Sequence, residues 1–223
     1  MSSSVKPWLS SRRTASGFDV TVSGSRDSHA HAWVADVRAA LDSRIPVRTA
    51  VDGTRRAAVA VILRAGTDGA PEVFFIKRAD YAGDPWSGQV AFPGGRHEPA
   101  DATLADTATR ETLEETGIDL VRDGTMLGVL DDLNPVINRL PAIVVTPFVV
   151  LLNHTVPLTL SSEVALAFWV TLDALSHGGS WRETQVLARG VSFNARAFDH
   201  EGHIIWGMTE RMVGQLVSLL QKS

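Results

Sequence analysis

The spacing of apolar and polar residues along the chain predicts strands and helices in a mixed order. Short apolar runs bounded by turn residues predict buried strands at 56–63, 73–76, 126–130, 143–152 and 164–170. Apolar residues at helical spacing predict helices at 30–44, 101–116, 172–176 and 209–220. A final hairpin is expected from 191–198 and 203–206. Because these elements follow no strict βαβ order, we predict an α/β fold with one mixed sheet between helices.

Polar stretches, glycine and proline predict where the elements begin and end. Residues 1–28 are polar and serine-rich, so we expect a flexible N-terminal tail followed by a single domain over 29–223. Gly117 is expected to end the helix at 101–116. Pro147 lies inside an apolar run, which indicates an edge strand or a bulge because proline lacks an amide hydrogen.

Composition narrows the functional classes. The 223 residues include 21 Lys and Arg against 25 Asp and Glu, a net charge of −4 that lacks the basic field of an electrostatic nucleic-acid binder. The absence of cysteine excludes disulfides, thiolate metal sites and a cysteine nucleophile. No apolar stretch is long enough to span a membrane, and the N-terminus lacks the apolar core of a secretory signal. We therefore expect a soluble cytoplasmic protein.

Three glutamates lie on one face of the helix predicted at 101–116. Glu111, Glu114 and Glu115 are related by i, i+3 and i+4, which places helical side chains ~5–6 Å apart. Carboxylates this close repel one another, and one neighbouring Arg110 offsets the repulsion only in part. A divalent cation offsets it more fully, and carboxylate oxygens suit Mg²⁺ or Mn²⁺. The alternative interpretation is a solvated acidic face, which is common on surface helices.

The residues around this helix resemble the signature of the Nudix hydrolases. That signature reads G, five residues, E, seven residues, R-E-U-x-E-E-x-G-U, where U is a bulky aliphatic residue. The corresponding segment of this chain, called the box below, spans residues 95–118. It begins at a Pro-Gly-Gly turn at 93–95. The R-E, E-E and G-U elements of the signature all match in register.

Two features of the box differ from the signature. Thr112 occupies the first aliphatic position. Fourteen residues separate Gly95 from Arg110, one more than the standard spacing. Counting from Gly95 places the first acidic position on Asp101, whereas counting back from Arg110 places it on Ala102. The alternative role of Asp101 is the N-cap of the helix.

Segments outside the box are similar to the coenzyme A pyrophosphatase-like branch of that family. Arg78-Ala79 lies upstream of a G-x-x-x-F-P-G-G sequence at 88–95, and Trp-Gly-Met-Thr stands at 206–209. A second arginine that the branch places between the first two pieces is absent, because residues 80–87 read DYAGDPWS.

The resemblance implies a fold and an activity. The fold is the Nudix α/β/α sandwich with a mixed sheet between helices, here with an added N-terminal helix. The activity is that of a Mg²⁺- or Mn²⁺-dependent pyrophosphohydrolase that cleaves the diphosphate of a nucleoside diphosphate linked to another group, with coenzyme A or its derivatives suggested by the branch. A homodimer is left open.

The resemblance also implies roles for individual residues. By motif position, Glu111, Glu114 and Glu115 hold the metal ions, and Arg110 orients the carboxylates. Glu114 and Glu163 are the two candidates for the general base. The substrate-binding candidates are Arg78, Trp86, Gly94, Gly95 and Arg139.

Several alternatives share these residues. The same box serves hydrolases of modified nucleoside triphosphates, sugar nucleotides or ADP-ribose. A nucleotide-sensing module without turnover is a different class, and the three surviving glutamates favour catalysis over it. An RNA-decapping enzyme is disfavoured because the sequence shows no concentrated basic patch.

Overall fold

The computed structural model describes residues 27–50, 53–81, 86–135, 143–177, 181–188 and 191–222. The tail expected at 1–28 lies outside this range except for residues 27 and 28, which already belong to the first helix. The elements are α1 (Asp27–Asp42), β1 (Arg55–Ala65), β2 (Pro71–Arg78), β3 (Val90–Ala91), β4 (Gly94–Arg96), α2 (Leu104–Thr116), α3 (Leu120–Asp123), β5 (Gly124–Val129), β6 (Ile143–Leu152), β7 (Val164–Thr171), α4 (Leu172–Ser176), β8 (Trp181–Ala188), β9 (Val191–His200), β10 (His203–Trp206) and α5 (Gly207–Leu220).

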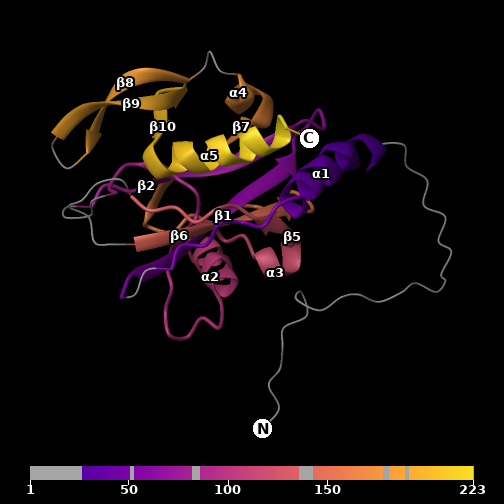
Figure 1. The fold of residues 1–223 in the computed structure, drawn as a ribbon, viewed down its shortest axis with the longest axis horizontal. Helices are drawn as coiled ribbons and strands as arrows, with labels where there is room; N and C mark the ends of the chain where they lie inside the picture. Colours follow the sequence, from indigo (N-terminus) through magenta and orange to yellow (C-terminus); the bar gives the residue numbers. More distant parts are fainter. Residues whose placement is uncertain are drawn as a thin grey trace, which may run out of the picture.

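A seven-stranded sheet forms the centre of the fold. Its strands follow the order β3-β2-β1-β6-β5, with β4 paired to β1 and β7 paired to β2. The β1–β6 pair is parallel and the remaining pairs are antiparallel, so the predicted mixed sheet is confirmed. A second sheet of three antiparallel strands, β10-β9-β8, lies beside α5 (Figure 1).

Helices cover both faces of the large sheet, as the α/β/α prediction requires. Strand β1 alternates its side chains between two apolar clusters. Val61 and Leu63 join the cluster that includes residues of α1 and α5, whereas Ala60 and Ile62 join the cluster that includes Ala108 of α2. Figure 1 shows α1 and α5 on one side of the sheet and α2 and α3 on the other. The period of two in β1 therefore separates two cores.

Most predicted elements are observed with small shifts at their ends. The helix predicted from residue 30 begins at Asp27, and the strand predicted at 73–76 covers Pro71–Arg78. Four elements were not predicted. Strands β3 and β4 have two and three residues, which is too short for an alternating pattern. Helix α3 has four residues, which is too short for a periodic signal, and β8 carries mostly polar residues because its sheet is largely exposed.

Pro147 does not lie on an edge strand, so that part of the prediction is wrong. Strand β6 runs between β1 and β5 inside the sheet. The Pro147 carbonyl accepts a hydrogen bond from the Leu130 amide (3.0 Å), so its nitrogen points to the β5 side. The β5 ladder ends at Val129, which pairs with Phe148. The proline nitrogen therefore lies just past the end of the β5–β6 ladder, where the lack of an amide hydrogen removes no hydrogen bond of that ladder.

Candidate active site

Helix α2 brings the acidic residues to the site, and local hydrogen bonds fix its ends. Thr103 is the N-cap, since its hydroxyl accepts the Asp106 amide (3.2 Å). Gly117 ends the helix with a φ of 75°, a left-handed conformation that glycine adopts at low cost. Between these ends Glu115 is buried and Glu114 is exposed. The helix therefore spreads its acids from the protein interior to the surface.

Thr112 is compatible with the apolar position that it occupies. Its side chain is fully buried, and its hydroxyl donates to the Ala108 carbonyl one turn earlier (2.7 Å). The polar group is thus satisfied within the helix and adds no unpaired donor to the core.

Asp101 is not the N-cap, and the structure gives it a different contact. Its carboxylate receives two hydrogen bonds from Arg110, at 2.9 Å from Nε and 3.1 Å from Nη2. These bonds hold the pKa of Asp101 well below its usual range and raise that of Arg110. Arg110 Nη1 then donates to Glu111 (3.0 Å) and Glu114 (3.2 Å). Asp101 thus holds the arginine that contacts the acids.

The glycines at 94 and 95 allow the backbone to approach these acids. Gly94 has a φ of 148°, and a Cβ there would lie 2.3 Å from the Ala58 carbonyl oxygen. A Cβ on Gly95 would lie 2.4 Å from the carboxyl carbon of Glu111. The Gly94 amide donates to Glu115 Oε2 (2.9 Å). Side chains at either position would therefore displace a strand or a carboxylate.

Burial changes the protonation of two of the acids. It raises the pKa of Glu115 to about 7 and also raises the pKa of Glu111. The charge of Glu163 raises both pKa values further, so Glu163 is electrostatically part of the cluster. Arg78 opposes the effect at Glu115, with Nη1 3.6 Å from Oε1.

Strand pairing brings Glu163 to this cluster. Arg78 ends β2 and pairs with Val164 at the start of β7. The amide of Ala79 donates to the Glu163 carbonyl (2.8 Å), which fixes the exposed acid beside Arg78. A residue 48 positions beyond Glu115 in the sequence therefore reaches the same pocket.

The chemistry of this donor set fits a hard divalent cation. Glu111, Glu114, Glu115 and Glu163 line one pocket with Arg78 and Arg110, so acids outnumber these two arginines. Within the described residues, no three acidic or histidine side chains already converge as a ready-made metal site. Binding a cation would therefore require these side chains to turn toward it.

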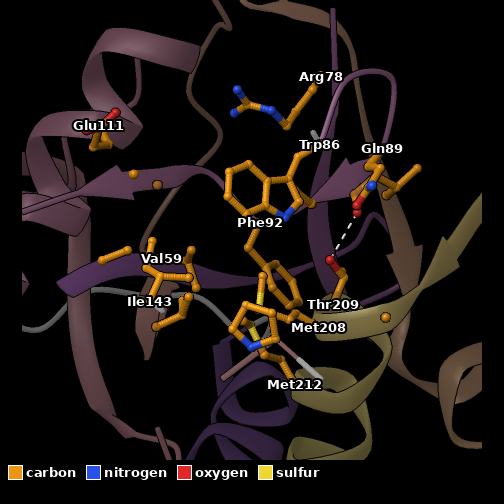
Figure 2. A pocket seen from close by; sticks show the side chains of 18 of the residues that line it. Val59, Arg78, Trp86, Gln89, Phe92, Glu111, Ile143, Met208, Thr209 and Met212 are labelled. Atoms are coloured by element: carbon orange, nitrogen blue, oxygen red, sulfur yellow. Dashed lines mark hydrogen bonds between the residues drawn. The ribbon is translucent and has the colours of Figure 1, made fainter. Parts of the chain in front are cut away.

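The pocket extends well beyond the acids. Its volume is about 650 Å³, and Figure 2 shows Glu111 and Arg78 at one end, Met208 and Met212 at the other, and Trp86 between them. Gly94 and Gly95 also line it, whereas Arg139 lies outside the described residues.

The apolar part of the pocket was not predicted as part of the site. Met208 and Thr209 belong to the Trp-Gly-Met-Thr segment, which is the signal that could have indicated it. The Thr209 hydroxyl donates to the Val90 carbonyl (3.0 Å), which fixes the first turn of α5 against β3.

Comparison with known proteins shows relatives over most of the chain. A family model for the NUDIX domain matches residues 54–190. The uncharacterized Nudix hydrolase NudL of Photorhabdus laumondii is 35% identical over 136 residues, covering 60% of this chain and 70% of that protein. NudL of Yersinia pestis is 31% identical over 163 residues, covering 73% of this chain and 78% of that protein.

Solved structures share the fold. A MutT/nudix family protein from Enterococcus faecalis superposes with a TM-score of 0.55 at 14% identity, covering 91% of this chain and 76% of that one. A NUDIX hydrolase from Alicyclobacillus acidocaldarius gives a TM-score of 0.51 at 21% identity, covering 76% of this chain and 93% of that one.

Over the described residues, no helix combines the length and apolar character needed to cross a membrane. The matched domain model and the NudL relatives show that this chain belongs to the Nudix family of hydrolases.

Proposed function

We propose that this chain hydrolyses a phosphoanhydride bond in a nucleoside diphosphate linked to another group, with Mg²⁺ or Mn²⁺ bound at the acids of α2. One observation carries the proposal: the Glu111 and Glu115 carboxyl groups meet the Gly94–Gly95 turn in a pocket that also contains Arg78 and Arg110. Membership of a hydrolase family supports the reaction class.

Glu111, Glu114 and Glu115 are the residues that would hold the cation. When bound, such a cation neutralises charge on the diphosphate and lowers the pKa of a nearby water. Burial alone disfavours the ionised forms of Glu111 and Glu115, and a divalent charge reverses that effect. The donor set therefore fits the cation electrostatically.

The remaining side chains orient the carboxylates, contact the phosphate or accept a proton. Arg110, held by Asp101, fixes the directions of Glu111 and Glu114 through its Nη1. Arg78 lines the pocket beside Glu115 and is placed to contact a phosphate oxygen. The proton of the attacking water passes to the carboxylate of either Glu114 or Glu163.

Coenzyme A is the first substrate to test, because residues 78–79, 88–95 and 206–209 resemble the branch that cleaves it. The test is a mass-resolved screen of purified protein with Mg²⁺ or Mn²⁺ against coenzyme A, ADP-ribose, sugar nucleotides, dinucleoside polyphosphates and modified nucleoside triphosphates. Release of 3′,5′-ADP and phosphopantetheine above all other turnovers supports coenzyme A. Turnover of another compound keeps the reaction and replaces the substrate. Metal-dependent binding without any turnover indicates a sensor instead of an enzyme.

A further inference from the structure

The pocket has two halves of opposite chemistry. The polar half contains the acids and arginines described above, whereas the apolar half is lined by Val59, Phe92, Ile143, Val145, Met208 and Met212. These six side chains come from β1, the segment after β3, β6 and α5, and all six belong to or pack against the core cluster between the sheet and α5. The apolar half is therefore an opening in that core, continuous with the polar half (Figure 2).

Among the described residues, the six side chains of the apolar half offer no hydrogen-bonding group to a nucleobase or a sugar. None of its six side chains has a nitrogen or oxygen atom. The adjacent Thr209 hydroxyl is committed to the Val90 carbonyl at 3.0 Å. At the rim, Arg211 Nη1 donates to the Asn134 carbonyl at 2.7 Å. Burying the polar edge of a base here would leave its hydrogen bonds unmade, which is unfavourable.

The same residues suit a flexible hydrocarbon. Phe92, Val145 and Met212 are at most 4% exposed, so a group that contacts them loses water on that side. Met208 and Met212 lie one turn apart on the same face of α5, and methionine side chains adapt to irregular apolar shapes. A phosphate at the Arg78 end leaves this space for the substituent on its far side.

We propose that the apolar half binds an aliphatic chain carried by the second substituent of the diphosphate substrate. This inference rests on the proposed function, because it places the diphosphate at the acidic end of the pocket. The substrate class is thus a nucleoside diphosphate ester that ends in an alkyl chain, in preference to a second nucleoside or a sugar.

The test measures binding separately from turnover. The probes are non-hydrolysable α,β-methylene-ADP analogues that carry ethyl, butyl or hexyl esters on the terminal phosphonate, with the corresponding diadenosine analogue as the competing class. Their Kd values are measured by isothermal titration calorimetry with Mg²⁺. We expect Kd to fall about threefold to fourfold per added methylene, or about 80- to 250-fold from ethyl to hexyl.

Two variants of matched chemistry locate the effect. Met208→Gln places an amide in the apolar half at a half-buried position, and we expect the gain to drop below about twofold per methylene. Met208→Leu keeps the position apolar and should keep the wild-type gain in affinity per methylene. Met126→Gln makes the same change at a half-buried position in the other apolar cluster, across the sheet, and should keep the wild-type slope.

The outcomes separate this inference from the proposed function. A Kd that does not depend on chain length, no binding of any analogue, or tighter binding of the diadenosine analogue than of the hexyl ester would overturn the inference. Hydrolysis of ADP alkyl esters is assayed in parallel. If Kd falls with chain length but no analogue is hydrolysed, the aliphatic site stands and the proposed reaction is contradicted. If ADP alkyl esters are hydrolysed but Kd does not change with chain length, the reaction stands and the aliphatic site is contradicted.

Discussion

At the scale of single residues, the Gly95 backbone determines where the Glu111 carboxyl group can lie. The position of a β-carbon on residue 95 coincides with that carboxyl group, at 2.4 Å from its carbon. Any side chain there moves Glu111, and Arg110 would have to follow because its Nη1 contacts the same carboxylate at 3.0 Å. The lack of a side chain at residue 95 therefore leaves the space that Glu111 and its contact with Arg110 require.

Gly95→Ala should lower kcat/KM about 100-fold, because displacing a catalytic group by about 1 Å has an effect of that size. The matched control is Gly214→Ala in α5, where a Cβ meets no atom within 4 Å. The control should keep its activity and gain about 0.5–1 kcal/mol of stability, since alanine replaces glycine inside a helix. Both are measured by steady-state hydrolysis and thermal unfolding. Equal activity of Gly95→Ala and Gly214→Ala would contradict the role of the glycine.

Asp101→Asn should raise the Mg²⁺ concentration for half-maximal activity and lower kcat by about 10- to 100-fold, because residues that orient metal ligands have effects of this size. The change keeps the shape of the side chain and removes the charge that pairs with Arg110 at 2.9 and 3.1 Å. Asp106→Asn, in the first turn of α2, is the control and should keep both values near wild type. If the two variants titrate with Mg²⁺ identically, Asp101 does not position the acids.

At the scale of elements, the ends of helices and strands bring the site together. Helix α2 was predictable from local sequence, because i, i+4 spacing and the glycine at its end are local signals. Gly94 and Gly95 were predicted in a turn and instead begin strand β4, because their pairing with β1 is a long-range contact. The role of Asp101 was left open between the acidic position of the box and the helix N-cap, and the structure gives the N-cap to Thr103. The contact of Asp101 with Arg110 depends on the path of the 97–103 loop, which no spacing rule gives.

A buried carboxylate joins the segment after α1 to the central sheet. The Asp132 side chain is fully buried and accepts hydrogen bonds from Arg48 (3.0 Å), Arg56 (3.2 Å), Thr146 Oγ1 (2.7 Å) and the Thr49 amide (2.9 Å). These bonds connect residues 48–49 with β1 and β6. Asp131 also holds this segment, because it accepts the Val47 amide (2.8 Å) and pairs with Arg44.

Asp132→Asn should lower the free energy of unfolding by about 2 kcal/mol. The loss is smaller than for a fully buried ion pair because the Arg48 and Arg56 side chains are 41% and 34% exposed. The measurement is the urea midpoint, with the exposed Asp36→Asn on α1 as the control. A midpoint shared by the wild type and both variants would show that Asp132 contributes nothing to stability.

At the scale of the whole molecule, the pocket forms where distant elements meet. Glu163 reaches it through the β2–β7 pairing, and Met208 and Met212 reach it through the packing of α5 on the sheet. The sequence identified the α2 acids because they form one contiguous motif. It could not identify the apolar half, because Val59, Ile143 and Met212 each follow ordinary core patterns and become pocket residues only in the folded chain.

If the acids of α2 bind the metal for diphosphate hydrolysis, turnover will depend on both the metal and these side chains. The most direct measurement compares wild type with Glu114→Gln on the best substrate of the screen, with Mg²⁺ and with EDTA. Glu114 is exposed, so the variant should keep its fold, which circular dichroism checks. We expect wild-type turnover with Mg²⁺, none with EDTA, and a loss of about 1,000-fold or more in Glu114→Gln. Equal turnover of the two proteins, or turnover of the wild type in EDTA, would contradict the account.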